Sequence, residues 1–177
     1  DNDLPSGSDR VYQCAKILNL SSETKIINVQ GDEPLIDPKS IDMTAKLLDT
    51  ENVDVATLCS KFSNEKELMD ESNVKVTFSK NYRAQYFSRS IIPHNFTNQS
   101  VDYFKHIGIY AFRNSFLNKF KKFKQTKLEL AEMIEALRII ENGYNIHMIE
   151  IDHEHISIDT IDAVSYTHLT LPTIVSV

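Results

Sequence analysis

The sequence has little cysteine and lacks the long apolar runs of membrane proteins. Two of its 177 residues are cysteines, Cys14 and Cys59. Each falls inside an apolar periodic stretch without CxxC spacing, so neither a disulfide nor a cysteine-bound metal is indicated, and we expect two buried thiols. No apolar run is long enough to cross a membrane, and residues 1–7 lack the basic-then-apolar pattern of a signal peptide. These absences favour a soluble, cytoplasmic protein.

An excess of basic charge is also lacking. Lysine and arginine total 19 against 25 aspartates and glutamates, which gives a net charge of -6 at pH 7. A broad electrostatic grip on nucleic acid or on an anionic membrane is therefore excluded, since both need clustered positive charge. Any anion that the protein binds must be held by a few local groups.

Glycine is scarce, and each of the four glycines falls where backbone geometry matters. Gly7 and Gly31 lie in predicted loops that a ligand can approach closely. Gly108 interrupts a predicted strand, and Gly143 closes a predicted helix. The two loop glycines therefore mark candidate ligand sites.

Hydrophobic spacing predicts an α/β domain. A helix is expected over 9–19, a strand over 25–30, a helix that begins at Asp37–Pro38, and a strand over 53–60. This alternation with short loops is typical of a largely parallel sheet. Residues 73–78, 84–88 and 104–112 then have strand character with few helical signals between them, which indicates an antiparallel excursion.

A capping box at Thr126 and Glu129 predicts the next helix. Its apolar face is expected to run continuously to Gly143. The residues of that face are Leu130, Met133, Ile134, Leu137 and Ile140. A last strand is expected over 144–151.

One domain is expected over residues 1–164, because the length fits a single core. Residues 165–177 have no charge and no helical period. We interpret them as a tail foreign to the domain and exclude them from the fold.

Two acidic residues follow predicted strands. Asp32 stands just past the strand that ends at Gln30, where open α/β sheets bind ligands. Asp159 stands in the loop after the last predicted strand. If both loops lie at one sheet edge, the two carboxylates can share a magnesium ion with phosphate oxygens. The alternative is structural: Asp32 caps a turn that Pro34 stiffens, and Asp159 caps a helix.

Five motifs in order resemble the 3-deoxy-manno-octulosonate (Kdo) cytidylyltransferase family. They are QGDEPLI, YFSRSIIP, KHIGIYAF, EALRIIENGYNI and SIDT. The resemblance runs from Ser6 to about Asp162. It implies a Rossmann-like α/β nucleotidyltransferase fold with a mostly parallel sheet and an inserted antiparallel β excursion, usually as a homodimer. It also implies transfer of CMP from CTP to Kdo, which gives CMP-Kdo and diphosphate for lipopolysaccharide biosynthesis.

The resemblance assigns the nucleotide and metal residues. Asp32 and Asp159 match the two catalytic, magnesium-binding aspartates of the family. The matches to its nucleotide pocket are Gly7, Ser8, Arg10 and Gln30. Family members often have threonine where Ser8 stands, and either hydroxyl can form the same hydrogen bond.

Four further residues match positions around the sugar acid: Arg89, His106, Tyr110 and Glu135. A guanidinium can hold a carboxylate bidentately, and the other three can hydrogen-bond hydroxyls. Two alternatives stay open from the residues alone. Glu135 can pair with Arg138 on a solvated helix face, and His106 can be a structural histidine.

Besides Ser8, the sequence departs from the family at three places. Ala136 stands where many relatives have glutamine, and HNFTN after Pro93 lacks an arginine that some relatives place there. An 8-amino analogue of Kdo is therefore an alternative substrate. A basic loop of the RLPGKP kind that cradles the triphosphate is not found, so we expect an absent N-terminal nucleotide-binding segment and poor activity of this chain alone. A sialic acid cytidylyltransferase and a non-catalytic sugar-binding or dimerisation fragment remain alternatives.

Overall fold

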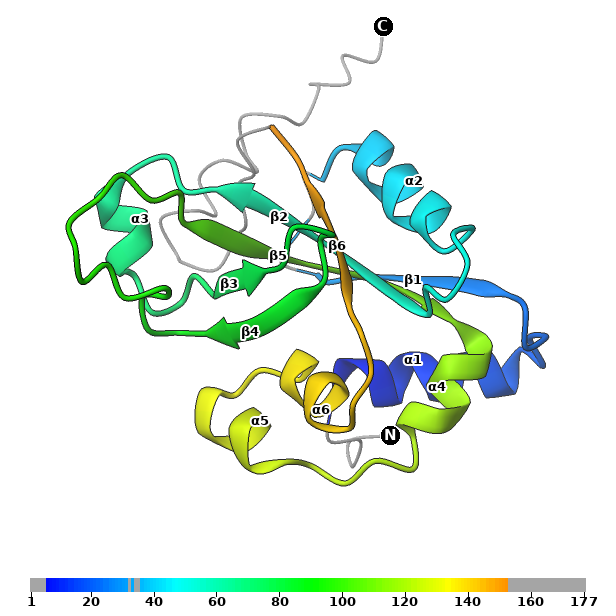
Figure 1. The fold of residues 1–177 in the computed structure, drawn as a ribbon. Helices are drawn as coiled ribbons and strands as arrows, with labels where there is room; N and C mark the ends of the chain where they lie inside the picture. The colour runs from blue at the N-terminus through cyan, green and yellow to red at the C-terminus, as the bar shows by residue number, and fades with distance from the viewer. Residues whose placement is uncertain (1–5, 32, 34–35, 153–177) are drawn as a thin grey trace, which may run out of the picture.

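The computed structural model describes residues 6–31, 33 and 36–152, and these form one sheet between two helical layers (Figure 1). Helix α2 (Pro38–Leu47) packs on one face. The helices of the other face are α1 (Gly7–Ile17), α4 (Asn114–Phe120), α5 (Lys127–Glu132) and α6 (Ala136–Glu141). A short helix, α3 (Glu65–Met69), lies beside one end of the sheet. The predicted α/β architecture is confirmed.

The sheet of the described residues has six strands. They are β1 (Lys25–Val29), β2 (Val55–Lys61), β3 (Lys75–Phe78), β4 (Ala84–Ser88), β5 (Phe104–Arg113) and β6 (His147–Glu150). Their order is β4-β3-β5-β2-β6, and β1 also pairs with β5. Strand β5 pairs with β3 near its start and with β1 over its second half, while β2 follows its other edge. It is therefore the central strand.

A mostly parallel sheet was expected, but most neighbouring strands of the sheet pair antiparallel, so this expectation is wrong. Only β2 and β6 pair in parallel among the described strands, whereas β5 is antiparallel to β1, β2 and β3. The physical reason is that β5 inserts between β1 and β2. These two strands run in the same direction, as the alternation of helices and strands predicts, but they do not pair with each other.

The predicted continuous helix from Thr126 to Gly143 is also wrong, although the Glu129 half of its capping box is present, with Glu129 Oε2 accepting from Thr126 N at 3.1 Å, while the Thr126 hydroxyl has no partner among the described residues. Helix α5 stops because Met133 adopts a left-handed conformation, with φ 55°. Met133 is 74% exposed, whereas Ile134 is buried. The break lets Glu132 accept from Ser88 Oγ at 2.8 Å while Ile134 packs in the core. Contacts with other elements of the fold therefore outweigh the helical spacing of the apolar residues that predicted one continuous helix.

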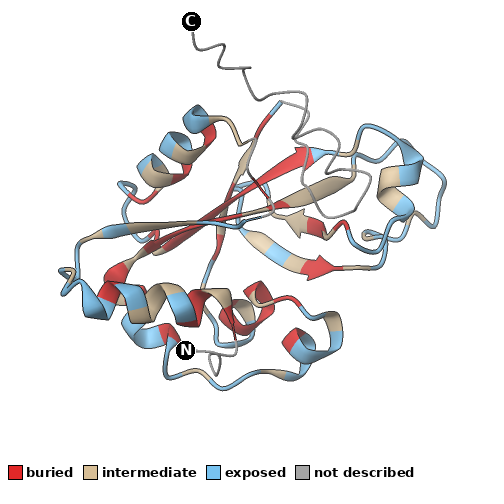
Figure 2. Cartoon of the chain, turned by 180° about the vertical axis from the view of Figure 1, so that it is seen from behind, coloured by how far each residue is buried: buried red, intermediate tan, exposed pale blue. Residues whose placement is uncertain are grey.

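The core fills both faces of the sheet, and the most buried stretches run along β2 and β5 (Figure 2). The larger cluster lies under α4 and α6 and contains a row of rings on one side of β5 and α4. Tyr110 stacks on Phe112, and Phe112 on Phe116, at centroid distances of 5.8 and 6.3 Å. Smaller clusters lie under α2. The stacked rings of Phe112 and Phe116 therefore pack α4 against β5.

The two cysteines differ in environment. Cys59 is buried, and burial raises the pKa of its thiol to about 12. Cys14 is exposed, so the expectation of two buried thiols is wrong for this residue. Cys14 lies on the solvent-facing side of helix α1. Within the described residues no helix is both long and apolar enough to cross a bilayer.

A buried ion network ties α1 to α5 and α6. The Arg138 side chain is 2% exposed and donates from Nε to Glu129 Oε2 at 2.8 Å and from Nη2 to Glu129 Oε1. Its Nη1 lies 3.5 Å from Asp9 Oδ2, and the guanidinium stacks over Phe120 at 4.8 Å. Ser6 Oγ also donates to Asp9. Each buried charge therefore has a partner, which burial requires.

We predict that Arg138→Met lowers the free energy of unfolding by about 3–5 kcal/mol, because it removes the cation beside the buried carboxylate of Glu129 and leaves Asp9 only Lys121, 3.7 Å away, and the Ser6 hydroxyl. Urea denaturation measures the change. Lys61→Met is the control, since Lys61 and Asp102 form an exposed pair at 2.7 Å, which water screens, so its loss should change the free energy of unfolding far less. Equal losses for the two variants would contradict the network's role.

Candidate functional site

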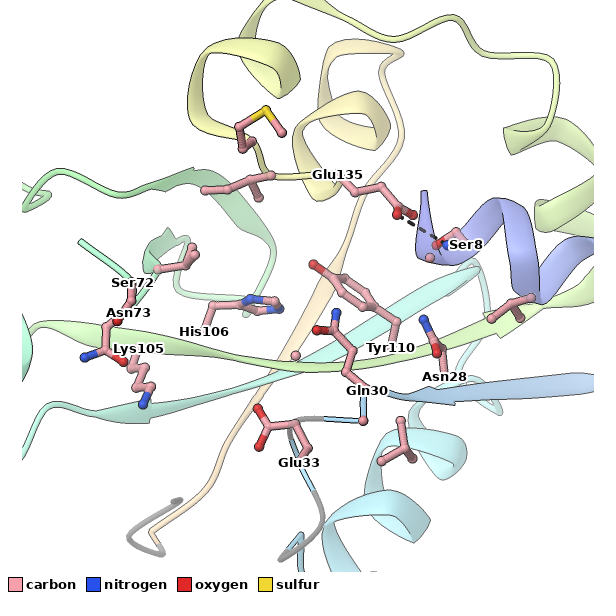
Figure 3. Close-up of a pocket in the computed structure, with 18 of the residues that line it drawn as sticks. Ser8, Asn28, Gln30, Glu33, Ser72, Asn73, Lys105, His106, Tyr110 and Glu135 are labelled. Atoms are coloured by element: carbon pink, nitrogen blue, oxygen red, sulfur yellow. Dashed lines mark hydrogen bonds between the residues drawn. The ribbon is translucent and has the colours of Figure 1, made fainter. Parts of the chain in front are cut away.

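A cleft of about 710 Å³ lies beside the central strand (Figure 3). Its floor is formed by β1 and β5. Its walls are the first turn of α1, residues 72–74, Arg89, and the link between α5 and α6. The cleft thus lies where six separate parts of the chain meet.

Three floor residues come from alternate positions of β5: His106, Gly108 and Tyr110. The alternation predicted this shared face. Asn28 and Gln30 reach the cleft from β1 and the residue after it. Gly108 lets the Gln30 side chain pack closely, since a Cβ there would lie 3.0 Å from Gln30 Oε1 and would push the amide aside. The predicted interruption of the strand is a register shift in the β2–β5 pairing beside Thr57.

The His106 ring lies between two aromatic rings, with Phe87 edge-on at 5.0 Å and Tyr110 tilted at 5.2 Å. Its Nε2 lies 2.9 Å from Thr57 Oγ1. Burial lowers the pKa of His106 to about 3, so the ring is neutral at physiological pH. His106 is therefore both a hydrogen-bonded structural histidine and a residue of the cleft floor, and the two interpretations are compatible.

Glu135 reaches across the cleft to the start of α1. Its Oε2 accepts from Ser8 N at 3.3 Å, which places a negative charge at a helix N-terminus (Figure 3). The alternative pair with Arg138 on a solvated face is wrong, since Arg138 is buried against Glu129 and Asp9. Burial, and then the charge of Glu135, raises the pKa of Tyr110, so this phenol keeps its proton.

Arg89 is held by backbone oxygens. Its Nε donates to Glu132 O at 2.8 Å and its Nη1 to Glu71 O at 2.9 Å. A fully buried lysine, Lys75, donates from Nζ to Arg89 O at 2.9 Å and to Asp70 O at 2.7 Å. The guanidinium is therefore fixed in place, with nitrogens left over for a ligand. Sequence reasoning missed Lys75, although a lysine between valines of a strand was a signal.

The structure brings all of the predicted site residues that it describes to this one cleft. They are Gly7, Ser8, Arg10, Gln30, Arg89, His106, Tyr110 and Glu135. Their roles as ligands stay predictions. Sequence reasoning missed further polar residues of the same wall, namely Asn28, Glu33, Ser72, Asn73 and Lys105. Glu33 and Lys105 stand inside the motifs QGDEPLI and KHIGIYAF, which could have pointed to them, whereas Asn28, Ser72 and Asn73 belong to no motif and only the fold identifies them.

The proposed metal ligands Asp32 and Asp159 lie outside the described residues. The neighbours of Asp32 in the chain, Gly31 and Glu33, both line the cleft. Strands β1 and β6 run in the same direction, so their carboxyl ends face the same edge of the sheet. Within the part of the chain that the structure describes, no cluster of three or more histidines, cysteines or carboxylates is present.

The depressed pKa of His106 predicts a pH-dependent stability. Between about pH 6.5 and pH 3 the unfolded chain takes up a proton that folded His106 does not, so the free energy of unfolding falls as pH falls. The expected slope is about 1.4 kcal/mol per pH unit below pH 6. Urea denaturation at several pH values measures it, and His106→Gln should lose this slope. Identical pH profiles of variant and parent would contradict the burial effect.

Comparison with known proteins identifies the fold and the family. A family model described as cytidylyltransferase matches residues 1–151. A 3-deoxy-manno-octulosonate cytidylyltransferase of Fusobacterium nucleatum subsp. nucleatum is 42% identical over 88% of this chain. An 8-amino-3,8-dideoxy-manno-octulosonate cytidylyltransferase of Shewanella sp. (strain W3-18-1) is 40% identical over 81% of the chain. The chain spans about three fifths of the length of these curated relatives, 63% and 60%.

A solved structure of CMP:2-keto-3-deoxy-manno-octonic acid synthetase, complexed with CTP, is also similar. Its TM-score is 0.85 at 32% identity, over 95% of this chain and 68% of that chain. This match confirms the predicted nucleotidyltransferase fold, and the sequence matches confirm the resemblance that five short motifs indicated. The chain therefore belongs to the cytidylyltransferase family, as a relative of the 3-deoxy-manno-octulosonate cytidylyltransferases.

Proposed function

We propose that this chain is part of an enzyme that transfers CMP from CTP to 3-deoxy-D-manno-octulosonate and releases diphosphate. The observation that carries the proposal is the meeting of eight predicted ligand residues in one cleft. The relatives named for this activity, and a similar structure complexed with CTP, support it.

The nucleotide side of the cleft is the proposed place of CTP. Gly7, Ser8 and Arg10 stand at the first turn of α1, and Gln30 stands at the end of β1. Gly7 lets a ligand approach the backbone, and Arg10 adds a positive charge for phosphate. The Gln30 side chain, packed against Gly108, offers both an amide donor and an acceptor.

The sugar side of the cleft has both donors and acceptors. Arg89 and Lys105 bring positive charge, which suits the carboxylate of the sugar acid. Glu135, His106 and Tyr110 suit its hydroxyls. This division of charge favours a polyhydroxy acid over a neutral sugar or a plain carboxylic acid.

The proposed reaction is an in-line displacement. The anomeric hydroxyl of the sugar acid attacks the α-phosphorus of CTP, loses its proton, and displaces diphosphate as the bond to the β-phosphate breaks. Asp32 and Asp159 are the proposed holders of magnesium, since two carboxylates with phosphate oxygens are hard donors that this ion prefers. Magnesium, when bound, offsets phosphate charge and lowers the pKa of the attacking hydroxyl. The residues of the cleft orient the two substrates for attack.

The location and assembly of the protein belong to the same proposal. A cytoplasmic homodimer whose product, CMP-Kdo, supplies lipopolysaccharide biosynthesis fits the family. No nucleic acid or membrane partner is proposed, because the chain has a net charge of -6.

Two other functions remain candidates. Transfer to the 8-amino analogue of Kdo is favoured by the Shewanella relative at 40% identity. A non-catalytic sugar-binding or dimerisation fragment, which would use the same cleft, is the other candidate. Magnesium-dependent consumption of CTP separates an enzyme from a binding module, and a panel of Kdo, 8-amino-Kdo and sialic acid identifies the acceptor.

We predict that Glu135→Gln in the complete protein lowers kcat/KM for Kdo about 10- to 100-fold, because hydrogen bonds to a charged group contribute about 1.5–3 kcal/mol. Steady-state release of diphosphate measures the rate. Glu141→Gln, at an exposed position of α6, is the matched control and should keep the parent rate. Unchanged kcat/KM for Glu135→Gln would refute the sugar site.

A second prediction concerns the proposed metal site: Asp32→Asn in the complete protein should abolish most turnover, measured in the same assay. Full turnover by Asp32→Asn would refute that site.

A further inference from the structure

Thr57 and His106 form a hydrogen bond whose direction can be worked out. Thr57 is fully buried in β2, and its single hydroxyl oxygen faces three groups. These are Ile109 O at 2.6 Å, Ile107 O at 3.3 Å and His106 Nε2 at 2.9 Å. The register shift between β2 and β5 at this point brings the two carbonyls to the same side chain.

The hydroxyl has one proton, and the carbonyls can only accept. Two oxygens 2.6 Å apart repel each other unless a proton lies between them, so the Thr57 proton points at Ile109 O. The hydroxyl oxygen can then only accept from His106. The Nε2 atom of His106 must therefore carry a proton.

The neutral imidazole has one N–H, so its Nδ1 is left as an acceptor. The ring is neutral because Phe87 and Tyr110 enclose it and burial lowers its pKa to about 3. Within residues 6–31, 33 and 36–152, Nδ1 has no hydrogen-bond partner, and it is not among the buried polar atoms that lack one. Since the ring lines the cleft, Nδ1 is open to a ligand there.

We propose that Thr57 is a positioning residue that fixes the Nε2–H tautomer of His106, so that His106 Nδ1 accepts a hydrogen bond from a hydroxyl of the bound sugar acid. This inference rests on the proposed function for the identity of the ligand. With a bare Nδ1, His106 selects a hydroxyl donor and repels a carboxylate or phosphate at that point. The carboxylate is thereby directed to the cationic side of the cleft.

The test uses the ¹⁵N resonances of the histidine ring, which distinguish a protonated from a bare nitrogen. The ligand-free chain should show His106 with protonated Nε2 and bare Nδ1. Thr57→Ser keeps the hydroxyl and should keep this pattern. Thr57→Val has nearly the same shape but no acceptor, so the Nδ1–H form should increase. A protonated Nδ1 in the parent chain, or a Thr57→Val spectrum like that of the parent, would overturn the assignment.

Addition of Kdo tests the second part of the proposal, the acceptor role of His106 Nδ1. The Nδ1 resonance should shift on binding, and Thr57→Val should bind Kdo roughly 3- to 10-fold more weakly than Thr57→Ser. Binding of Kdo without a shift of Nδ1 would overturn the acceptor role. If Kdo does not bind at all, the proposed function fails together with this role, while the ligand-free spectrum still decides the tautomer. If Thr57→Val does not fold, the parent and Thr57→Ser spectra decide it alone.

Discussion

The pairing of β5 with three other strands holds both the sheet and the cleft in place. Its first half pairs with β3 and its second half with β1, while β2 follows the opposite edge. Alternate residues of the same strand form the floor of the cleft. A shift of β5 by one residue would turn His106 and Tyr110 to the other face, so the register of one strand decides whether the site exists.

Buried polar groups hold the walls of the cleft. Lys75 fixes the backbone of Arg89, and Thr57 contacts the ring of His106. Arg138 joins the helix that carries Ser8 to the segment that carries Glu135. Such groups cost free energy when buried and persist where their hydrogen bonds are satisfied. In this molecule each one stands directly behind a residue of the site.

Much of the fold and site was predictable from the sequence, for local reasons. Helix α2 begins at the Asp37 cap and Pro38, and the alternation in β5 places His106 with Tyr110. The predictions that were wrong concern features that depend on contacts between segments distant in the sequence. Nothing local shows that β5 inserts between β1 and β2, or that the helix breaks at Met133 so that Ile134 meets the core. The roles of Lys75 and Thr57 were missed for the same reason, because their partners come from other elements.

The account depends on one cleft that receives both substrates side by side. Amide chemical shifts of the ¹⁵N-labelled chain, recorded with CTP and then with Kdo, test this most directly. The account predicts that CTP perturbs Ser8 and Gln30, and that Kdo perturbs His106 and Glu135. Perturbations confined to Asn114 and Asn118, which line a separate groove between α1 and α4, would contradict it.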